Sequence, residues 1–202
     1  MHSLVDCISG FCLRKGIVTD NQLPWFKYGL EKRISSILVS IPFFFLAVIL
    51  SDIFVASAFF TCFYVLRSRT NGFHAKTFWG CFFLSIVYVI LFIGVLYHIL
   101  DTAAIGLVAI IGASCIWMLA PFNSSEMHLS NAEEKACRTS SRISSISILL
   151  GGFVFQGFGL ATITKGLFLG IAMAAYLLCL AYILNGGFYH GKRKRSNQEP
   201  YD

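Results

Sequence analysis

The sequence predicts an all-α, polytopic membrane protein of about six transmembrane helices, with N-terminal helices in the membrane interface and both termini in the cytoplasm. Three observations carry this prediction. The chain of 202 residues is 56% hydrophobic and only 13% charged, whereas a soluble domain is about 25% charged. Its apolar residues gather into long runs, and its basic residues lie between alternate runs. The bilayer must therefore be the solvent for most of the chain.

The first 33 residues contain two short apolar stretches that we expect to form helices. Leu4, Ile8 and Phe11 recur at helical spacing in the first stretch, and the second begins at Leu23. Charged residues are spread through the region, so it lacks the clean apolar core and cleavage site of a signal peptide. Both helices could lie in the membrane interface or pack beneath the bundle.

Six apolar runs follow, and each is a candidate span, because a helix needs about 20 residues to cross the hydrocarbon core. The second run is short, so it should extend into the basic residues that follow or end inside the protein. Pro121 should end the fourth helix, and the capping pattern from Ser130 to Glu133 should start the next. Glycines in the last two runs favour close packing. The runs are 34–50, 53–66, 78–100, 102–120, 143–164 and 166–184.

The distribution of charge sets the orientation. Every Lys and Arg except Lys165 lies before the first run, between the second and third, between the fourth and fifth, or in the tail. Basic loops stay in the cytoplasm, so orientation accounts for the net charge of +6, and no nucleic-acid partner is expected. We divide the chain into an interfacial region (1–33), a six-helix catalytic domain (34–184) and a basic, partly disordered cytoplasmic tail (185–202), which suits anionic membrane lipid.

The segment 67–81, RSRTNGFHAKTFWGC, holds the side chains that are most able to take part in a chemical reaction. Cys81 lies at an expected helix start among basic residues, and both features lower the pKa of a thiol. His74 would be the general base and then the acid that protonates the leaving amine. On one continuous helix these residues would be about 10 Å apart along the axis. A dyad therefore requires His74 on a loop that folds back over the helix start, and Asn71-Gly72 supports such a turn.

Other readings of these residues remain open. A His and a Cys seven residues apart are a weak signal, and the basic residues could serve orientation only. Cys137, flanked by Lys135 and Arg138 and nine residues after His128, is a rival nucleophile. A metal site from the same His and Cys residues lacks any paired-ligand motif, so we expect no cofactor.

The pattern Arg67…Asn71-Gly72-Phe73-His74-Ala75…Cys81 resembles the signature of the accessory gene regulator B (AgrB) family of bacterial membrane endopeptidases, which process quorum-sensing peptide precursors. Residues 28–31 (YGLE) and 120–123 (APFN) are similar to two further family elements, and the resemblance extends from about residue 25 to 185. It departs from the family at Asn71, where a second Gly is usual. Asn also tolerates a left-handed backbone, so the turn should be kept.

The resemblance implies that Cys81 and His74 are the catalytic pair of a cysteine endopeptidase, a thiol protease that matures an autoinducing peptide for quorum-sensing control of virulence. Cys81 would cleave an AgrD-type precursor, keep the retained part as a thioester and promote thiolactone or lactone closure. Such precursors pair an amphipathic helix with an acidic tail, which suits the interface and the basic surface. We expect supporting or substrate-binding roles for Arg67, Gly72, Asn71, Arg69, Lys76, Lys135 and Arg138.

The resemblance also implies a homodimer in the bacterial cytoplasmic membrane, with the active site on the cytoplasmic side. The main alternative is a small polytopic transporter that exports peptide without covalent catalysis, and a second is a structural partner of a sensor complex. Either alternative should tolerate the removal of Cys81. The precursor, its cleavage site and the ring size are properties of the substrate and cannot be read from this chain.

Overall fold

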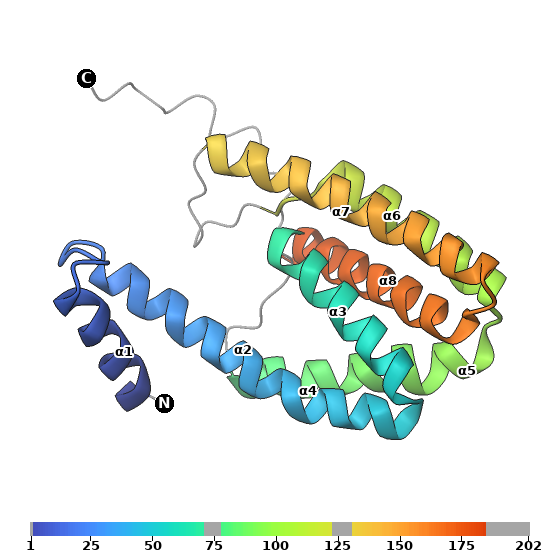
Figure 1. Ribbon diagram of the computed structural model, residues 1–202, viewed down its shortest axis with the longest axis horizontal. Helices are drawn as coiled ribbons and strands as arrows, with labels where there is room; N and C mark the ends of the chain where they lie inside the picture. The colour runs from blue at the N-terminus through green and yellow to red at the C-terminus, as the bar shows by residue number, and fades with distance from the viewer. Residues whose placement is uncertain (1, 71–77, 123–130, 185–202) are drawn as a thin grey trace. The chain divides into compact units, whose positions relative to one another are not determined.

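The computed structural model describes residues 2–70, 78–122 and 131–184, and all regular structure within them is helical (Figure 1). This confirms the all-α prediction. Within these ranges, three helical stretches are long and apolar enough to cross a membrane: Phe82–Ile99, Thr102–Leu119 and Ala161–Leu184. The elements in order are α1 (His2–Arg14), α2 (Leu23–Leu50), α3 (Ile53–Thr70), α4 (Phe78–Val89), η1 (Ile90–Leu96), α5 (Tyr97–Ile99), α6 (Thr102–Leu119), α7 (Asn131–Gly157) and α8 (Ala161–Leu184).

The chain divides into two compact units, residues 1–45 and 46–202. In the first unit, the Lys27 ammonium lies 2.6 Å from an Asp6 carboxylate oxygen, an exposed ion pair that links α2 to α1. The second N-terminal stretch is not a separate helix as expected, because α2 runs from Leu23 through residue 33 to Leu50 without interruption. The residues around that point, 30–33 (LEKR), are good helix formers, which explains the continuity.

The second unit is built around α8, which packs against α3, α6, α7 and η1 (Figure 1). The face of α8 toward α3 has glycines at the points of closest contact. A Cβ added at Gly166 would lie 2.7 Å from the Val55 carbonyl oxygen, and one added at Gly170 would lie 2.8 Å from the Cys62 Cβ. The backbones of α3 and α8 therefore approach closely, as the small residues predicted.

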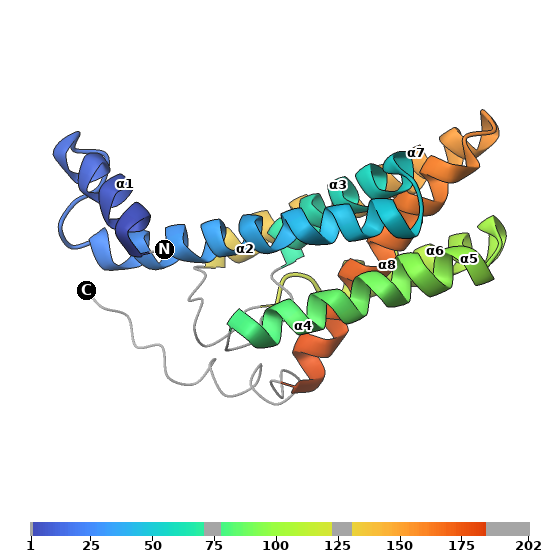
Figure 2. The ribbon, with the colours of Figure 1, turned by 90° about the horizontal axis from the view of Figure 1, so that it is seen from below.

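The predicted boundary between the fifth and sixth spans is wrong. Residues 143–164 were expected to form one span, but α7 ends at Gly157 and α8 begins at Ala161 (Figure 2). Gly159 has a φ of +77°; its N–H donates to the Gln156 carbonyl, and the Leu160 N–H donates to the Phe155 carbonyl, both at 3.0 Å. These are the two bonds of a Schellman motif. Gly159 thus ends a helix rather than packing against one.

The other helix ends in this unit follow local signals. The carboxylate of Asp101 accepts from the Ala104 N–H at 2.7 Å and caps α6, and α6 ends before Pro121 as predicted. The next helix begins at Asn131, where the capping pattern placed it. The third run is helical from Phe78 to Ile99, but its middle, η1, is a π-helix, a local widening that sequence patterns do not reveal.

Lys165, the one basic residue expected outside the cytoplasm, lies at the end of the unit where α5 ends and α8 begins. Its ammonium donates to the carbonyl oxygens of Tyr97 at 3.3 Å and Leu100 at 3.0 Å, and it lies 5.1 Å from the centroid of the Tyr97 ring. Carbonyls at a helix C-terminus lack intrahelical partners, so Lys165 satisfies them from another helix.

Candidate functional site

The opposite end of the unit gathers the C-terminal ends of α3, α6 and α8. The Phe122 N–H donates to the Thr70 carbonyl at 2.9 Å and so joins the segment after α6 to the end of α3. The Tyr182 hydroxyl of α8 donates to the Leu119 carbonyl at 2.8 Å, and its ring lies 5.0 Å from that of Phe122. These contacts fix the end of α3 against α6 and α8.

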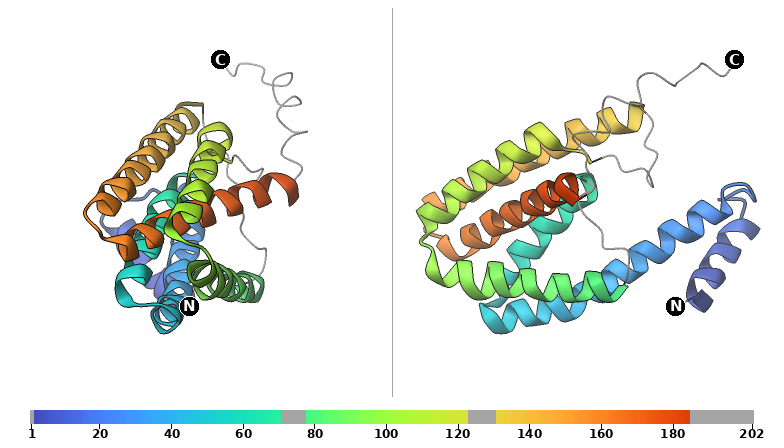
Figure 3. Two further views of the ribbon diagram at one scale, coloured as in Figure 1. Left: turned by 90° about the vertical axis from the view of Figure 1, so that its right-hand side faces the viewer. Right: turned by 180° about the vertical axis from the view of Figure 1, so that it is seen from behind.

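Arg142 joins α7 to the same end. Its Nε donates to the Trp117 carbonyl at 3.1 Å, and its guanidinium lies 4.7 Å from the centroid of the Trp117 ring. Figure 3 shows α6 and α7 running side by side. Because Trp117 is in the last turn of α6, this contact places Arg142 level with the end of an apolar helix, and the N-terminal turns of α7 project beyond it.

The structure places two of the predicted site residues in the last turn of α3. The helix continues to Thr70 and includes Arg67 and Arg69, which confirms that the second run extends into the basic segment. Both arginines are half-buried. The partial negative charge at a helix C-terminus favours cations there, so the backbone itself stabilises this basic position.

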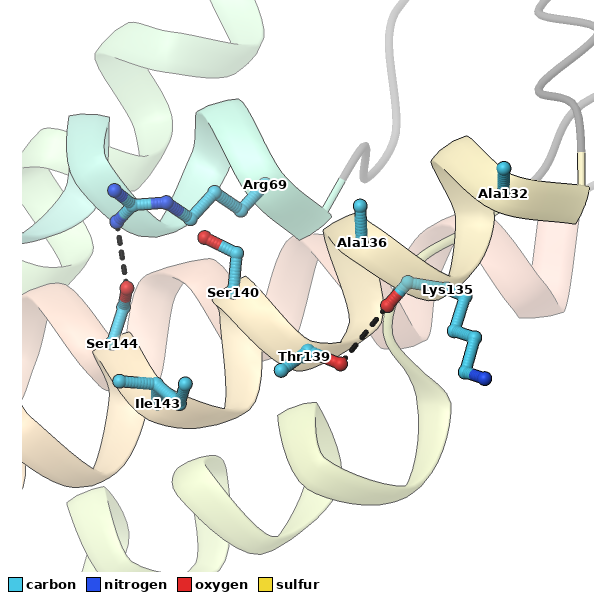
Figure 4. Close-up of a pocket in the computed structure, with 8 residues that line it drawn as sticks. All are labelled: Arg69, Ala132, Lys135, Ala136, Thr139, Ser140, Ile143 and Ser144. Carbon is cyan, nitrogen blue, oxygen red and sulfur yellow. Dashed lines mark hydrogen bonds between the residues drawn. The ribbon is translucent and has the colours of Figure 1, made fainter.

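Arg69 reaches across to α7, where it lines an open groove of about 700 Å³ (Figure 4). Its Nη1 donates to the Ser144 hydroxyl at 2.7 Å. Lys135, which the sequence also predicted as a site residue, lines the same groove nine residues before Ser144, and Figure 4 shows its ammonium directed away from Arg69. The lining residues are Arg69, Ala132, Lys135, Ala136, Thr139, Ser140, Ile143 and Ser144.

Arg138, the fourth predicted cation that the structure describes, is not part of the groove. It forms an i,i+4 ion pair with Glu134 at 3.1 Å on the surface of α7. The rival nucleophile Cys137 is a half-buried free thiol on the same helix, and it does not line the groove either.

Cys81 lies in the first turn of α4, as predicted, where the helix dipole is positive. The structure describes its backbone position. Asn71, Gly72, His74, Lys76 and His128 lie outside the described residues. The His74–Cys81 pair and the fold-back loop therefore stay predictions.

Sequence reasoning missed Ser144 as the partner of Arg69, and it missed the hydroxyls of Thr139 and Ser140 beside it. These residues belong to a Ser-rich stretch, 139–147 (TSSRISSIS), in which no single serine stands out. One signal was present: small residues recur at every fourth position, at Ala132, Ala136, Ser140 and Ser144. Residues four apart share a helix face, so this spacing indicates a smooth face along α7.

Comparison with protein families matches residues 7–182 to the model of accessory gene regulator B (AgrB). The matched region begins in α1, ends in α8 and includes the whole basic segment 67–81. No curated protein and no solved structure matches the chain.

Proposed function

The chain belongs to the accessory gene regulator B family, and from this premise we propose that it is a cysteine endopeptidase that cleaves and cyclises a quorum-sensing peptide precursor. Membership places the protein in the membrane and in the quorum-sensing system for which the family is named. The observation that carries the proposal is the match over residues 7–182, which takes in both His74 and Cys81.

The proposed reaction begins with the Cys81 thiol. His74 accepts its proton, and the thiolate attacks the scissile carbonyl of an AgrD-type precursor. His74 returns the proton to the departing amine, which leaves with the C-terminal tail. The retained part is then an acyl-thioester on Cys81. A thiol or hydroxyl within that part attacks the same carbonyl, closes a thiolactone or lactone and releases the Cys81 thiolate, which regains a proton.

Cys81 is suited to this role by its position in the chain. It is in the first turn of a helix whose next residues form the apolar stretch Phe82–Ile99, so in our proposal the thiolate sits at the edge of the membrane. Water competes with ring closure for the thioester, and an apolar surrounding lowers that competition.

For the topology we propose six spans with both termini in the cytoplasm, divided as residues 1–33, 34–184 and 185–202. Three of the spans would be the stretches that are long and apolar enough to cross the membrane. The apolar parts of α2, α3 and α7 would form the other three. Support comes from the alternation of charge: the basic residues of α3 and of the first part of α7 meet at one end of the unit, and Lys165 is at the other. The active site would then face the cytoplasm.

Among the remaining predicted residues, we propose that Arg67, Asn71, Gly72 and Lys76 support the catalytic segment and that Arg138 contributes to the basic surface that attracts the precursor. The precursor's acidic tail would be drawn to this surface by charge complementarity, and its amphipathic helix would lie in the interface. A homodimer is proposed from the family resemblance.

The test is mass spectrometry of an AgrD-type precursor co-expressed with the wild type, Cys81→Ser, His74→Ala and the control Cys137→Ser. We expect tail release and a thioester adduct in the wild type and in Cys137→Ser. His74→Ala should lose processing, and Cys81→Ser should show at most a trace of a stalled ester.

Processing by both Cys81→Ser and His74→Ala would refute the dyad and move attention to Cys137 and His128. An intact precursor with the wild-type protein, when the precursor is encoded beside this gene, would favour a transporter without covalent catalysis.

A further inference from the structure

The groove between α3 and α7 carries two cations and no acidic side chain. Its charged lining residues are Arg69 and Lys135. Among the residues that the structure describes, neither forms an ion pair, and Glu134 of α7 is paired with Arg138. The groove therefore has a positive charge that the described part of the protein does not balance.

The groove also offers hydrogen-bond donors. A guanidinium has five N–H donors, and for Arg69 the described part of the chain supplies one acceptor, the Ser144 hydroxyl. Within the same ranges, the hydroxyl protons of Ser140 and Ser144 have no acceptor. Figure 4 shows the Ser140 hydroxyl on the same side of α7 as the Arg69 side chain. A guanidinium flanked by hydroxyls is a receptor for a phosphate or a carboxylate.

The residues farther along α7 favour a phosphate that belongs to a lipid over a free phosphate or a carboxylate. Residues at helical spacing from the groove face continue it toward the far end of α7, and they include Leu150 and Val154. These side chains are 59% and 57% exposed, which in a membrane protein is a surface for acyl chains. Ile143, 61% exposed, lies within the groove itself. Exposed apolar side chains therefore follow the cationic groove along the same side of α7.

The depth of the groove relative to the membrane also fits a lipid headgroup. Arg142 stacks on Trp117 in the last turn of α6, an 18-residue apolar helix that is about 27 Å long at about 1.5 Å per residue. That length approaches the roughly 30 Å of the hydrocarbon core. Ser144 and Arg69 are therefore near the boundary where lipid phosphates lie, and Lys135 stands above it.

We propose that this groove binds the phosphate of an anionic phospholipid of the phosphatidylglycerol class. Arg69 and the Ser140 and Ser144 hydroxyls hold the phosphate, Lys135 adds charge from above, and one acyl chain lies along Ile143 and Leu150. The site does not include Cys81 or His74, so it stands independently of the proposed chemistry. It assigns Arg69 and Lys135 to lipid rather than to the precursor.

The experiment measures lipid retention by native mass spectrometry of the full-length protein released from nanodiscs of equal parts phosphatidylglycerol and phosphatidylcholine. The variants are Arg69→Gln, Lys135→Gln and their double, and the matched control is Arg138→Gln, which removes the same charge from a residue of α7 that does not line the groove. We expect about a fivefold loss of retained phosphatidylglycerol for each groove cation and about twenty-five-fold for the double, with the control and Cys81→Ser retaining as much as the wild type. Circular dichroism checks that each variant is folded.

Three results would overturn the proposal. Equal losses in Arg69→Gln and Arg138→Gln would show general attraction to an anionic surface. Displacement of the lipid by free glycerol phosphate at the same concentration would show a site for soluble phosphate. Saturable binding of an acidic decapeptide that depends on Arg69, with no preference for phosphatidylglycerol, would show that the groove is a peptide site.

Discussion

Replacing Gly166 by alanine should force α3 and α8 apart. The new Cβ would lie 2.7 Å from the Val55 carbonyl oxygen, 2.9 Å from the Ala58 Cβ and 3.3 Å from the Phe59 nitrogen. Two of these are backbone atoms, which cannot rotate away. Ordinary contact begins at 3.4 Å, which is about 0.7 Å farther from the Val55 oxygen, and overpacking of this kind costs about 1–3 kcal/mol. The helices would have to separate by that distance or bend.

Gly151→Ala is the matched control for this change. It is also a glycine inside a helix, but an added Cβ there meets nothing within 4 Å, so both variants share the gain in helix propensity of about 1 kcal/mol. The difference between them isolates the steric cost. We expect Gly166→Ala to unfold several degrees below Gly151→Ala in detergent, as followed by circular dichroism. Adding Ala58→Gly should restore part of the loss. Equal unfolding temperatures for Gly166→Ala and Gly151→Ala would refute the close approach of α3 and α8.

Three further changes test other contacts. Lys165→Met should lower the free energy of unfolding by about 1–3 kcal/mol, because it leaves two helix-end carbonyls without their donor; a denaturant titration measures this, and an unchanged midpoint would contradict the cap. Arg142→Lys should weaken the contact with Trp117, because an ammonium cannot stack as a guanidinium does, and tryptophan emission should shift while helicity is kept; an unaltered spectrum would count against the stacked geometry. Gly159→Ala should destabilise the turn between α7 and α8 by about 1–2 kcal/mol, because alanine resists a positive φ, and a stability equal to that of the wild type would argue against the Schellman motif.

The helices were predictable where a local signal marks their ends. Pro121 and the pattern beginning at Ser130 act through neighbouring residues, and the structure follows each of them where it describes it. Gly159 was misread because a glycine that ends a helix and one that packs against a helix look the same in a sequence. The continuity of α2 was missed because an amphipathic stretch and an apolar run can share one helix.

The sequence predicted where several residues of the candidate site lie in their helices, but it did not predict the groove. The positions of Arg67, Arg69 and Cys81 at helix ends follow from where the apolar runs begin and end. The groove did not follow, because the bond from Arg69 to Ser144 joins residues 75 positions apart in helices whose relative rotation no local pattern fixes. The pairing of His74 with Cys81 rests on the resemblance to the family signature, and it stays a prediction for the co-expression experiment.

The central place of α8 has a consequence for how the protein is made. Among the described helices α8 is the last in chain order, yet α3, α6 and α7 all pack against it. Because α7 also contacts α3 and α6, these three helices can begin to associate before α8 is made. The surface that all three share is complete only when α8 joins them, so a chain that stops before Ala161 would hold a partly assembled bundle.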